Sequence, residues 1–263
     1  MRRLLIILAA AATLMLAGPP AGAIINGEGD TTHLNVGVML VAQGNGFNPG
    51  LFCSGSLLSN GDATHPAVFL TAGHCVAALE YQIPAGTRVV VSFDSNLNPG
   101  PDGVLHPTNV IDVDDWNLIP SYFSHGANHR DVGVLFLSAA PSGLKPVQLP
   151  TVGFDEGLVG QQLTEVGYGL NSLDRGFNSQ NANFTTPGRR LTGTEKVSAV
   201  TPEWLITHAD PNSTCFGDSG GPQFFGGYVV SLTRNGDAAC RSVSSEQRLD
   251  LSDVRAWLND QIG

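Results

Sequence analysis

The chain is poor in charge, in basic residues and in cysteine. Only 14% of its 263 residues are charged while 42% are hydrophobic, which excludes a disordered chain and a coiled coil. The 13 basic residues face 23 acidic ones, a net charge of −10, with no basic cluster beyond the pairs Arg2-Arg3 and Arg189-Arg190. Nucleic acid and anionic membranes are therefore poor partners, because long-range repulsion opposes the encounter. No Cys-x-x-Cys occurs, so a zinc site built on thiolates is not expected.

Long apolar runs are absent after residue 23. The first 23 residues combine Arg2-Arg3, the apolar run Leu4–Ala17, a Gly-Pro-Pro break and the small-residue site Ala21–Ala23, which is the pattern of a secretory signal. The run is too short for a membrane span of ~20 residues. We therefore expect residues 1–23 to be removed and residues 24–263 to be secreted into the extracellular space. Loss of the two arginines would change the net charge from −10 to −12.

Export changes how the four cysteines are interpreted. An exported chain enters an oxidising compartment, and this one has an even number of cysteines: Cys53, Cys75, Cys215 and Cys240. Two disulfides are therefore expected, and the count alone leaves three pairings open.

Turn residues are abundant and separate short β-type runs. The 32 glycines and 16 prolines, with Asn and Asp, punctuate the chain in the pattern of an all-β sandwich or barrel. The expected strands are Val36–Ala42, Val68–Thr71, Arg88–Phe93, Val132–Leu137, Gln162–Val166, Leu205–Thr207 and Tyr228–Leu232.

A linker-like segment at 139–146 predicts two lobes, of about 24–138 and about 147–250. A closing helix at about 252–262 follows, with Ser252 as its cap and one apolar stripe at helical spacing. The stretch 171–188, rich in Asn, Ser, Gly and Thr, predicts a polar surface loop.

Two strings place polar side chains at the ends of apolar runs. At 71–75 the sequence Thr-Ala-Gly-His-Cys follows Val68–Leu70, so His74 lies where a strand ends. Asp131 begins the apolar run Val132–Leu137, and a carboxylate there needs partners because an unpaired buried charge is costly. An imidazole N–H would satisfy it. Taken singly, each residue also fits a purely structural role.

The most specific string is Cys-Phe-Gly-Asp-Ser-Gly-Gly-Pro at 215–222. Glycines on both sides of Ser219 permit a tight turn that exposes the hydroxyl and gathers N–H groups in one small space. Such a space binds an anion. A loop that only turns the chain does not need Gly217, Gly220 and Gly221 together.

Together these strings resemble the chymotrypsin-like (trypsin-fold) serine peptidase family, which has His, Asp and Ser in this chain order. The resemblance implies an all-β fold: two packed six-stranded antiparallel β-barrels of trypsin-like type with a short C-terminal helix. Ser219 corresponds to the nucleophile, His74 to the general base and acid, and Asp131 to the group that orients and stabilises the imidazole. The N–H groups of Gly217 and Ser219 correspond to the oxyanion hole.

The same resemblance selects the disulfides Cys53–Cys75 and Cys215–Cys240 from the three pairings. It implies a secreted serine endopeptidase that needs no cofactor and no metal. Protein or peptide substrates and protein inhibitors are the partners it implies, and the chain is expected to be a monomer.

Further positions resemble the family's substrate-binding and activation sites. Ser213 resembles the base of the primary specificity pocket, and Ser231, Leu232 and Thr233 resemble the strand that binds the substrate backbone. An uncharged Ser213 and a pocket narrowed by Thr233 predict cleavage after uncharged apolar residues of medium size.

The string Ile-Ile-Asn-Gly at 24–27 resembles the family's activated N-terminus. We expect signal cleavage to release Ile24, whose ammonium would then pair with Asp218.

Two other classes were weighed. A catalytically silent homologue that acts as a binding protein usually lacks a triad residue, whereas all three are present here. An α/β-hydrolase esterase also has a Gly-x-Ser-x-Gly string, but its order is Ser, acid, His, and its strands alternate with helices.

The sequons at Asn183 and Asn212 match glycan acceptors and matter only in a host that glycosylates.

Overall fold

The structure is a computed structural model, and it describes residues 24–170 and 188–263. The predicted signal peptide, the sequon at Asn183 and nearly all of the predicted polar loop lie outside the described residues. Within the described part of the chain, no helix is long and apolar enough to cross a membrane.

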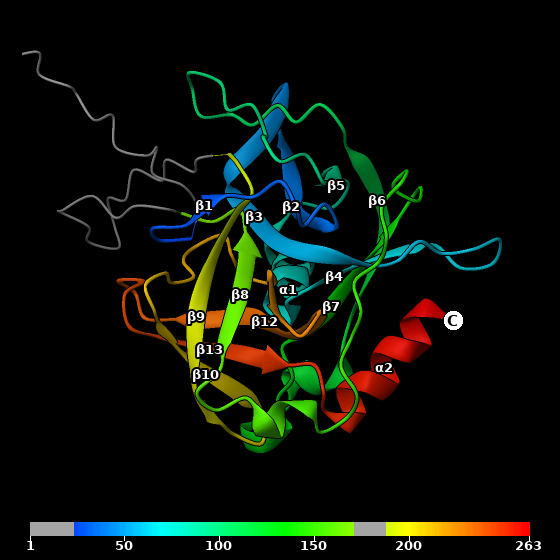
Figure 1. Cartoon of the computed structure of the whole chain (residues 1–263). Helices are drawn as coiled ribbons and strands as arrows, with labels where there is room; N and C mark the ends of the chain where they lie inside the picture. Colours follow the sequence, from blue (N-terminus) through cyan, green and yellow to red (C-terminus); the bar gives the residue numbers. More distant parts are fainter. Residues whose placement is uncertain (1–23, 171–187) are drawn as a thin grey trace, which may run out of the picture.

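Strands dominate the described chain (Figure 1). In chain order the elements are β1 (Glu28–Gly29), β2 (Val36–Gln43), β3 (Gly46–Ser59), β4 (Ala67–Thr71), α1 (Gly73–Gln82), β5 (Val89–Ser92), β6 (Ile111–Leu118), η1 (Pro120–Phe123), η2 (Gly126–Asn128), β7 (Gly133–Leu137), η3 (Phe154–Gly157), β8 (Gln162–Gly167), β9 (Leu191–Val200), β10 (Trp204–Ala209), β11 (Pro222–Phe225), β12 (Tyr228–Gly236), β13 (Val243–Arg248) and α2 (Ser252–Ile262).

The strands form two closed antiparallel barrels, as predicted. The first has the order β2-β3-β4-β7-β6-β5. The second runs β9-β10-β13-β12-β11-β8 and closes where β8 pairs with β9, while the short β1 attaches to β9 from outside. The seven predicted strands correspond to observed ones with differences at their ends, whereas β1, β6, β9, β11, β13 and α1 were not predicted.

The first barrel has an ordinary apolar core. Phe69, Val91 and Leu135 are fully buried there together with the Cys53–Cys75 disulfide. Alternation along the strands directs these side chains inward. The apolar runs around them therefore predicted strands. This barrel is a rigid support for the elements that leave its strand ends.

A second apolar cluster joins the two barrels to the closing helix. Leu70 of the first barrel and Leu232 of the second pack with Val254 and Leu258 of α2. The predicted cap of this helix is wrong, because Ser252 is its first helical residue and no side chain caps it. Burial of Val254 and Leu258 against both barrels holds α2 in place, at about 2 kcal/mol per buried side chain.

The second barrel differs from the first in having carboxyl groups in its interior. Glu165, Glu195 and Glu246 are all buried, and no more than 1% of any of them is exposed. On β8 and β9, two-residue spacing puts Glu165 on the face of Leu163 and Glu195 on the face of Val197, both core residues. Neutral groups surround these carboxyls: the Thr207 hydroxyl lies within hydrogen-bond distance of both Glu195 and Glu246, and Gln223 donates to Glu246.

Crowding of buried carboxyls keeps protons bound to them. Burial raises the pKa of Glu165 well above its usual value, and the charges of Glu195, Asp218 and Glu246 raise it further. Burial likewise raises the pKa of Glu246, with Glu195 adding to the effect. The folded chain therefore binds protons here that an unfolded chain would release near pH 4 to 5.

We predict that Glu165→Gln raises the free energy of unfolding at about pH 8 and changes it little at about pH 4.5. A carboxyl whose pKa is higher in the folded chain binds more protons there than in the unfolded chain as the pH rises, so stability falls with rising pH. The amide has the same shape and no proton to lose. Each unit by which the pKa was raised corresponds to about 1.4 kcal/mol.

Urea unfolding at both pH values measures this effect. The exposed Asp114→Asn removes a carboxyl from the surface and serves as the control. Equal effects of Glu165→Gln at the two pH values would contradict the prediction.

Candidate active site

His74 lies at the junction of the first barrel and helix α1. Strand β4 ends at Thr71 and α1 begins at Gly73, so His74 is in the first turn of the helix. The disulfide from the neighbouring Cys75 to Cys53 fastens this turn to β3. The side chain is 36% exposed, which leaves one side of the imidazole open to solvent.

Asp131 faces His74 from the segment before β7. Its Oδ2 lies 2.8 Å from His74 Nδ1, and its Oδ1 accepts a 2.7 Å hydrogen bond from the His74 backbone N–H. The Asp131 backbone N–H donates to Gln247 Oε1 of the second barrel at 2.6 Å. Burial favours the neutral acid, but hydrogen bonds and charge from His74, with the charge of Arg234, lower the pKa of Asp131 below its usual value. The carboxylate therefore orients the imidazole as predicted from the two strings.

Residues 215–222 form a tight turn at the start of β11. Gly217 and Gly220 have φ values of 96° and 77°, a region in which residues with a Cβ are strained. The N–H of Asp218 donates to Cys215 O at 3.0 Å, and that of Gly220 donates to Thr233 O at 2.8 Å. Among the described residues, none accepts a hydrogen bond from the N–H of Gly217 or Ser219. These two donors are available to a ligand.

The serine turn packs directly on the element that carries His74. A Cβ on Gly220 would lie 2.6 Å from Ala72 N, so only glycine allows this approach. The sulfur of Cys75 lies 3.9 Å from Ser219 O, and Ser54 Oγ donates to Gly217 O at 2.9 Å. The first barrel thus supplies His74 and the second supplies Ser219 at one junction.

Asp218 is a buried carboxylate beside the serine. Its Oδ1 accepts from Gly169 N at 2.8 Å, its Oδ2 accepts from Cys215 N at 3.0 Å, and the backbone N–H of Ile24 also donates to it. Burial raises the pKa of Asp218 to about 7 in spite of these bonds. A cation next to this carboxylate would restore its full charge.

Residues 24–26 are docked beside this carboxylate. The side chain of Ile24 is fully buried, and Ile25 N donates to Ser213 O at 2.9 Å. Asn212 holds the segment: its Nδ2 donates to Asn26 O at 2.8 Å while its Oδ1 accepts from Thr194 N at 2.9 Å. With its amide buried and bonded, Asn212 is not available as a glycan acceptor in the folded chain.

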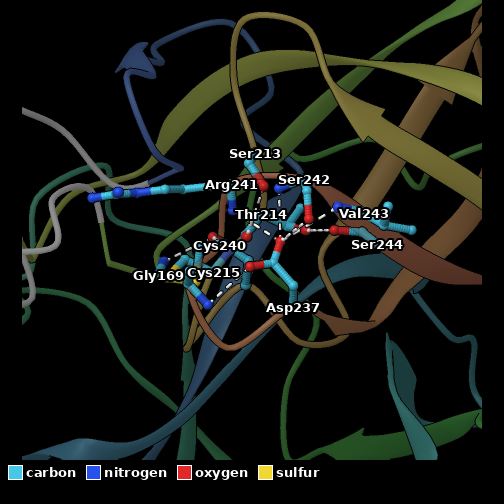
Figure 2. The surroundings of a disulfide bond; sticks show 12 residues. Gly169, Ser213, Thr214, Cys215, Asp237, Cys240, Arg241, Ser242, Val243 and Ser244 are labelled. Carbon is cyan, nitrogen blue, oxygen red and sulfur yellow. Dashed lines mark hydrogen bonds between the residues drawn. A yellow bond between two sulfur atoms is a disulfide. The ribbon is translucent and has the colours of Figure 1, made fainter. Parts of the chain in front are cut away.

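A cavity of about 120 Å³ opens next to Ser219. Its wall comes from the serine turn, the end of β12 and the following loop: Thr214, Cys215, Phe216, Ser219, Thr233, Arg234, Asn235, Gly236, Asp237 and Cys240. The Cys215–Cys240 disulfide ties the two sides of this wall together (Figure 2).

Asp237 braces the loop on one side of the cavity. In Figure 2 its carboxylate is directed at the backbone of residues 241–243, where Arg241 N and Ser242 N donate at 3.0 and 2.7 Å. Burial opposes ionisation, but these hydrogen bonds lower the pKa of Asp237 to about 2. The charge of Asp237 is therefore occupied in holding its own loop.

The predicted substrate-binding residues are only partly at this cavity. Thr233 lines it, but Ser231 is buried with its hydroxyl bonded to Gln223, and Leu232 belongs to the apolar cluster between the barrels. Ser213 is also buried and lies outside the wall. Along β12 and the loop that follows it, the wall continues from Thr233 to Asp237.

The described residues contain one cluster of potential metal-ligating atoms, formed by His74 with Cys53 and Cys75. Both sulfurs are bonded to each other in a disulfide, so neither is a thiolate that could bind a metal. This cluster offers a single imidazole and is not a metal site.

Comparison with known proteins agrees with this geometry. The profile of the Trypsin family matches residues 24–245. The chain therefore belongs to the trypsin family. A search of curated proteins found no match.

Solved structures with the same fold include HL collagenase, with 18% identity, a TM-score of 0.65 and coverage of 90% of this chain and 97% of that one. Human heparin binding protein has 16% identity, a TM-score of 0.63 and coverage of 90% and 96%. At these identities the likeness establishes the fold alone.

Proposed function

We propose that the chain is a secreted serine endopeptidase that cleaves protein or peptide substrates. The observation that carries the proposal is the 2.8 Å His74–Asp131 pair beside a turn in which the N–H groups of Gly217 and Ser219 have no partner among the described residues. A nucleophile, an oriented base and free donors are the three parts that acyl transfer needs.

In this proposal Ser219 Oγ attacks the peptide carbonyl carbon while His74 Nε2 takes the hydroxyl proton. The carbonyl oxygen becomes an oxyanion held by the N–H groups of Gly217 and Ser219, and one such donor contributes about 3 kcal/mol. The C–N bond then breaks, and His74 gives the proton to the leaving amine. Water, activated by the same imidazole, hydrolyses the acyl-enzyme. Asp131 holds the imidazole in the required tautomer and stabilises its cation.

A catalytically silent binding protein is the alternative. Fold does not imply function, and one structural neighbour is named for binding heparin. The presence of His74, Asp131 and Ser219 together favours the peptidase. Secretion, a monomeric state and inhibition by proteins that occupy the cleft are parts of the same proposal.

We predict that Ser219→Ala lowers peptidase activity at least ~10³-fold without changing the fold, because the nucleophile is lost while the cavity remains. Activity on a peptide library and labelling by a serine-directed phosphonate measure the effect. Ser121→Ala, on the surface 3₁₀ helix η1, is the control. A wild-type chain that neither cleaves nor labels would favour the binding protein instead.

The buried Asp218 supports a second part of the proposal, in which removal of residues 1–23 also activates the enzyme. The released ammonium of Ile24 would replace the amide N–H that now donates to Asp218. A positive charge there would hold the carboxylate ionised and fix the serine turn. No separate propeptide is then needed.

We predict that one extra alanine before Ile24 lowers kcat/KM about a hundredfold. The ammonium moves away from Asp218, and the loss of a buried charge partner costs about 3 kcal/mol. An extra alanine after Gly263 is the control, because that terminus is exposed. N-terminal sequencing of the active secreted protein is expected to begin at Ile24, and any other start would refute this route.

Substrate preference follows from the cavity beside Ser219. Its volume of about 120 Å³ fits a side chain of medium size, and Thr214 and Thr233 are among the residues of its wall. Glu195 lies behind Thr214 and accepts a 2.8 Å hydrogen bond from its backbone N–H. Burial raises the pKa of Glu195, so its attraction for a cation is weakened. We propose cleavage after uncharged residues.

We expect peptides with leucine or norleucine before the cut to have at least ~10-fold higher kcat/KM than the matched lysine and phenylalanine peptides. Lysine would desolvate its charge without a free counter-ion, and phenylalanine exceeds the cavity. Initial rates on the four matched peptides measure the order. A preference for lysine would show that the buried carboxyls act as a cation site.

A further inference from the structure

Arg234 of β12 lies between the cavity and the His74–Asp131 pair. Its Nε is 3.9 Å from Asp131 Oδ2, the same oxygen that lies 2.8 Å from His74 Nδ1. The residue also lines the cavity beside Ser219. The Asp131 carboxylate therefore has an arginine as well as the imidazole next to one of its oxygens.

Three separate elements hold the guanidinium in this position. It stacks over the ring of Trp204 on β10, with 4.3 Å from its carbon to the ring centroid. Its Nη1 donates to Ser245 Oγ on β13 at 3.2 Å. With Asp131 on the third side, the side chain is only 28% exposed, so this is a fixed cation rather than a mobile surface arginine.

Several other ionisable groups surround this pair. The backbone N–H of Arg234 donates to the buried Glu246, whose raised pKa favours its neutral form, and Asp237 lines the same cavity with its carboxylate bonded to its own loop. Tyr122 of η1 faces Asp131 and Arg234: burial raises its pKa, and the Asp131 charge adds to this while Arg234 opposes it. The ring of His129 packs between those of Tyr122 and Trp204. Arg130 is directed away, with its Nε 2.9 Å from Asp253.

A permanent cation near Asp131 disfavours a second cation on His74. Arginine remains charged at every pH at which a protein is folded. Because like charges disfavour each other, loss of the Arg234 charge is expected to favour the cationic form of the imidazole. A base that stays unprotonated to lower pH still accepts the proton of Ser219 in a mildly acidic medium.

We propose that Arg234 is a positioning residue that braces Asp131 and extends peptidase activity toward acidic pH. This inference rests on the proposed function. It agrees with the second barrel, whose buried carboxyls make the folded chain more stable at acidic pH than at basic pH.

The pH dependence of kcat/KM tests the proposal with three variants. In Arg234→Gln the acid limb is expected to move up by about 0.5 to 1 pH unit, which is a threefold to tenfold loss below the limb. Arg234→Lys keeps the charge and is expected to retain most of the wild-type limb. Arg88→Gln removes an exposed arginine that pairs with Asp112 and is expected to leave the profile unchanged.

A second readout does not need activity. In the Ser219→Ala background, NMR of the imidazole nitrogens follows protonation of His74, and His74→Gln identifies its signals among the seven histidines. Arg234→Gln is expected to move this transition to higher pH by the same amount. An unmoved NMR transition and acid limb would overturn the Arg234 proposal. A protein that never cleaves, yet shows the NMR shift, would refute the peptidase and retain the coupling.

Discussion

The carboxylate of Asp218 is the constraint on which the arrangement of the site depends. It is buried, yet it accepts N–H groups from Ile24, Gly169 and Cys215, which are far apart in the sequence. Those contacts fix the turn around it, in which the N–H groups of Gly217 and Ser219 have no acceptor within residues 24–170 and 188–263. A buried carboxylate is costly without a positive partner, so in the proposed maturation the release of Ile24 would act on the serine turn through Asp218.

The two barrels contribute unequally to the site. The first has an apolar core and presents His74 and Asp131 at its strand ends. The second carries buried carboxyls, and its Gln223, Thr207 and Thr214 connect them to the wall of the cavity. Gln247 and Arg234 reach across from the second barrel to Asp131. Both barrels therefore hold the His74–Asp131 pair. The second barrel, which carries Ser219, also places the charge of Arg234 beside Asp131.

Local patterns in the sequence predicted seven strands and two lobes, and the family resemblance supplied the two six-stranded barrels. The same patterns predicted an imidazole partner for Asp131, and the structure has the hydrogen bond between Asp131 and His74. The signals for these residues lie in short stretches of sequence. His74 and Asp131 are next to apolar runs, and the glycines around Ser219 are those that a tight turn requires. Strands β9 and β13 were missed because Glu195 and Glu246 point inward, so alternation of apolar and polar residues does not mark them. Two of the carboxyls that characterise this barrel therefore concealed the strands that carry them.

Contacts between residues far apart in the chain could not be predicted from the sequence. Nothing near Asn212 indicates that its amide holds residues 25 and 26, 186 or more positions away. The part of the cavity wall from Arg234 to Asp237 was not predicted, because pairing of β12 with β13 shifts register between Thr233 and Asn235 and this irregularity has no local signal. No local string indicates the contacts of Arg234 with Asp131, Trp204 and Ser245, because they arise from packing of separate elements.

The most direct test is a crystal structure of the secreted protein after reaction with a serine-directed phosphonate. The account predicts phosphorus bonded to Ser219 Oγ, a phosphoryl oxygen within hydrogen-bond distance of the N–H groups of Gly217 and Ser219, and the Ile24 ammonium beside Asp218. An unmodified Ser219, or a labelled one with Ile24 in solvent and the serine turn unchanged, would contradict it.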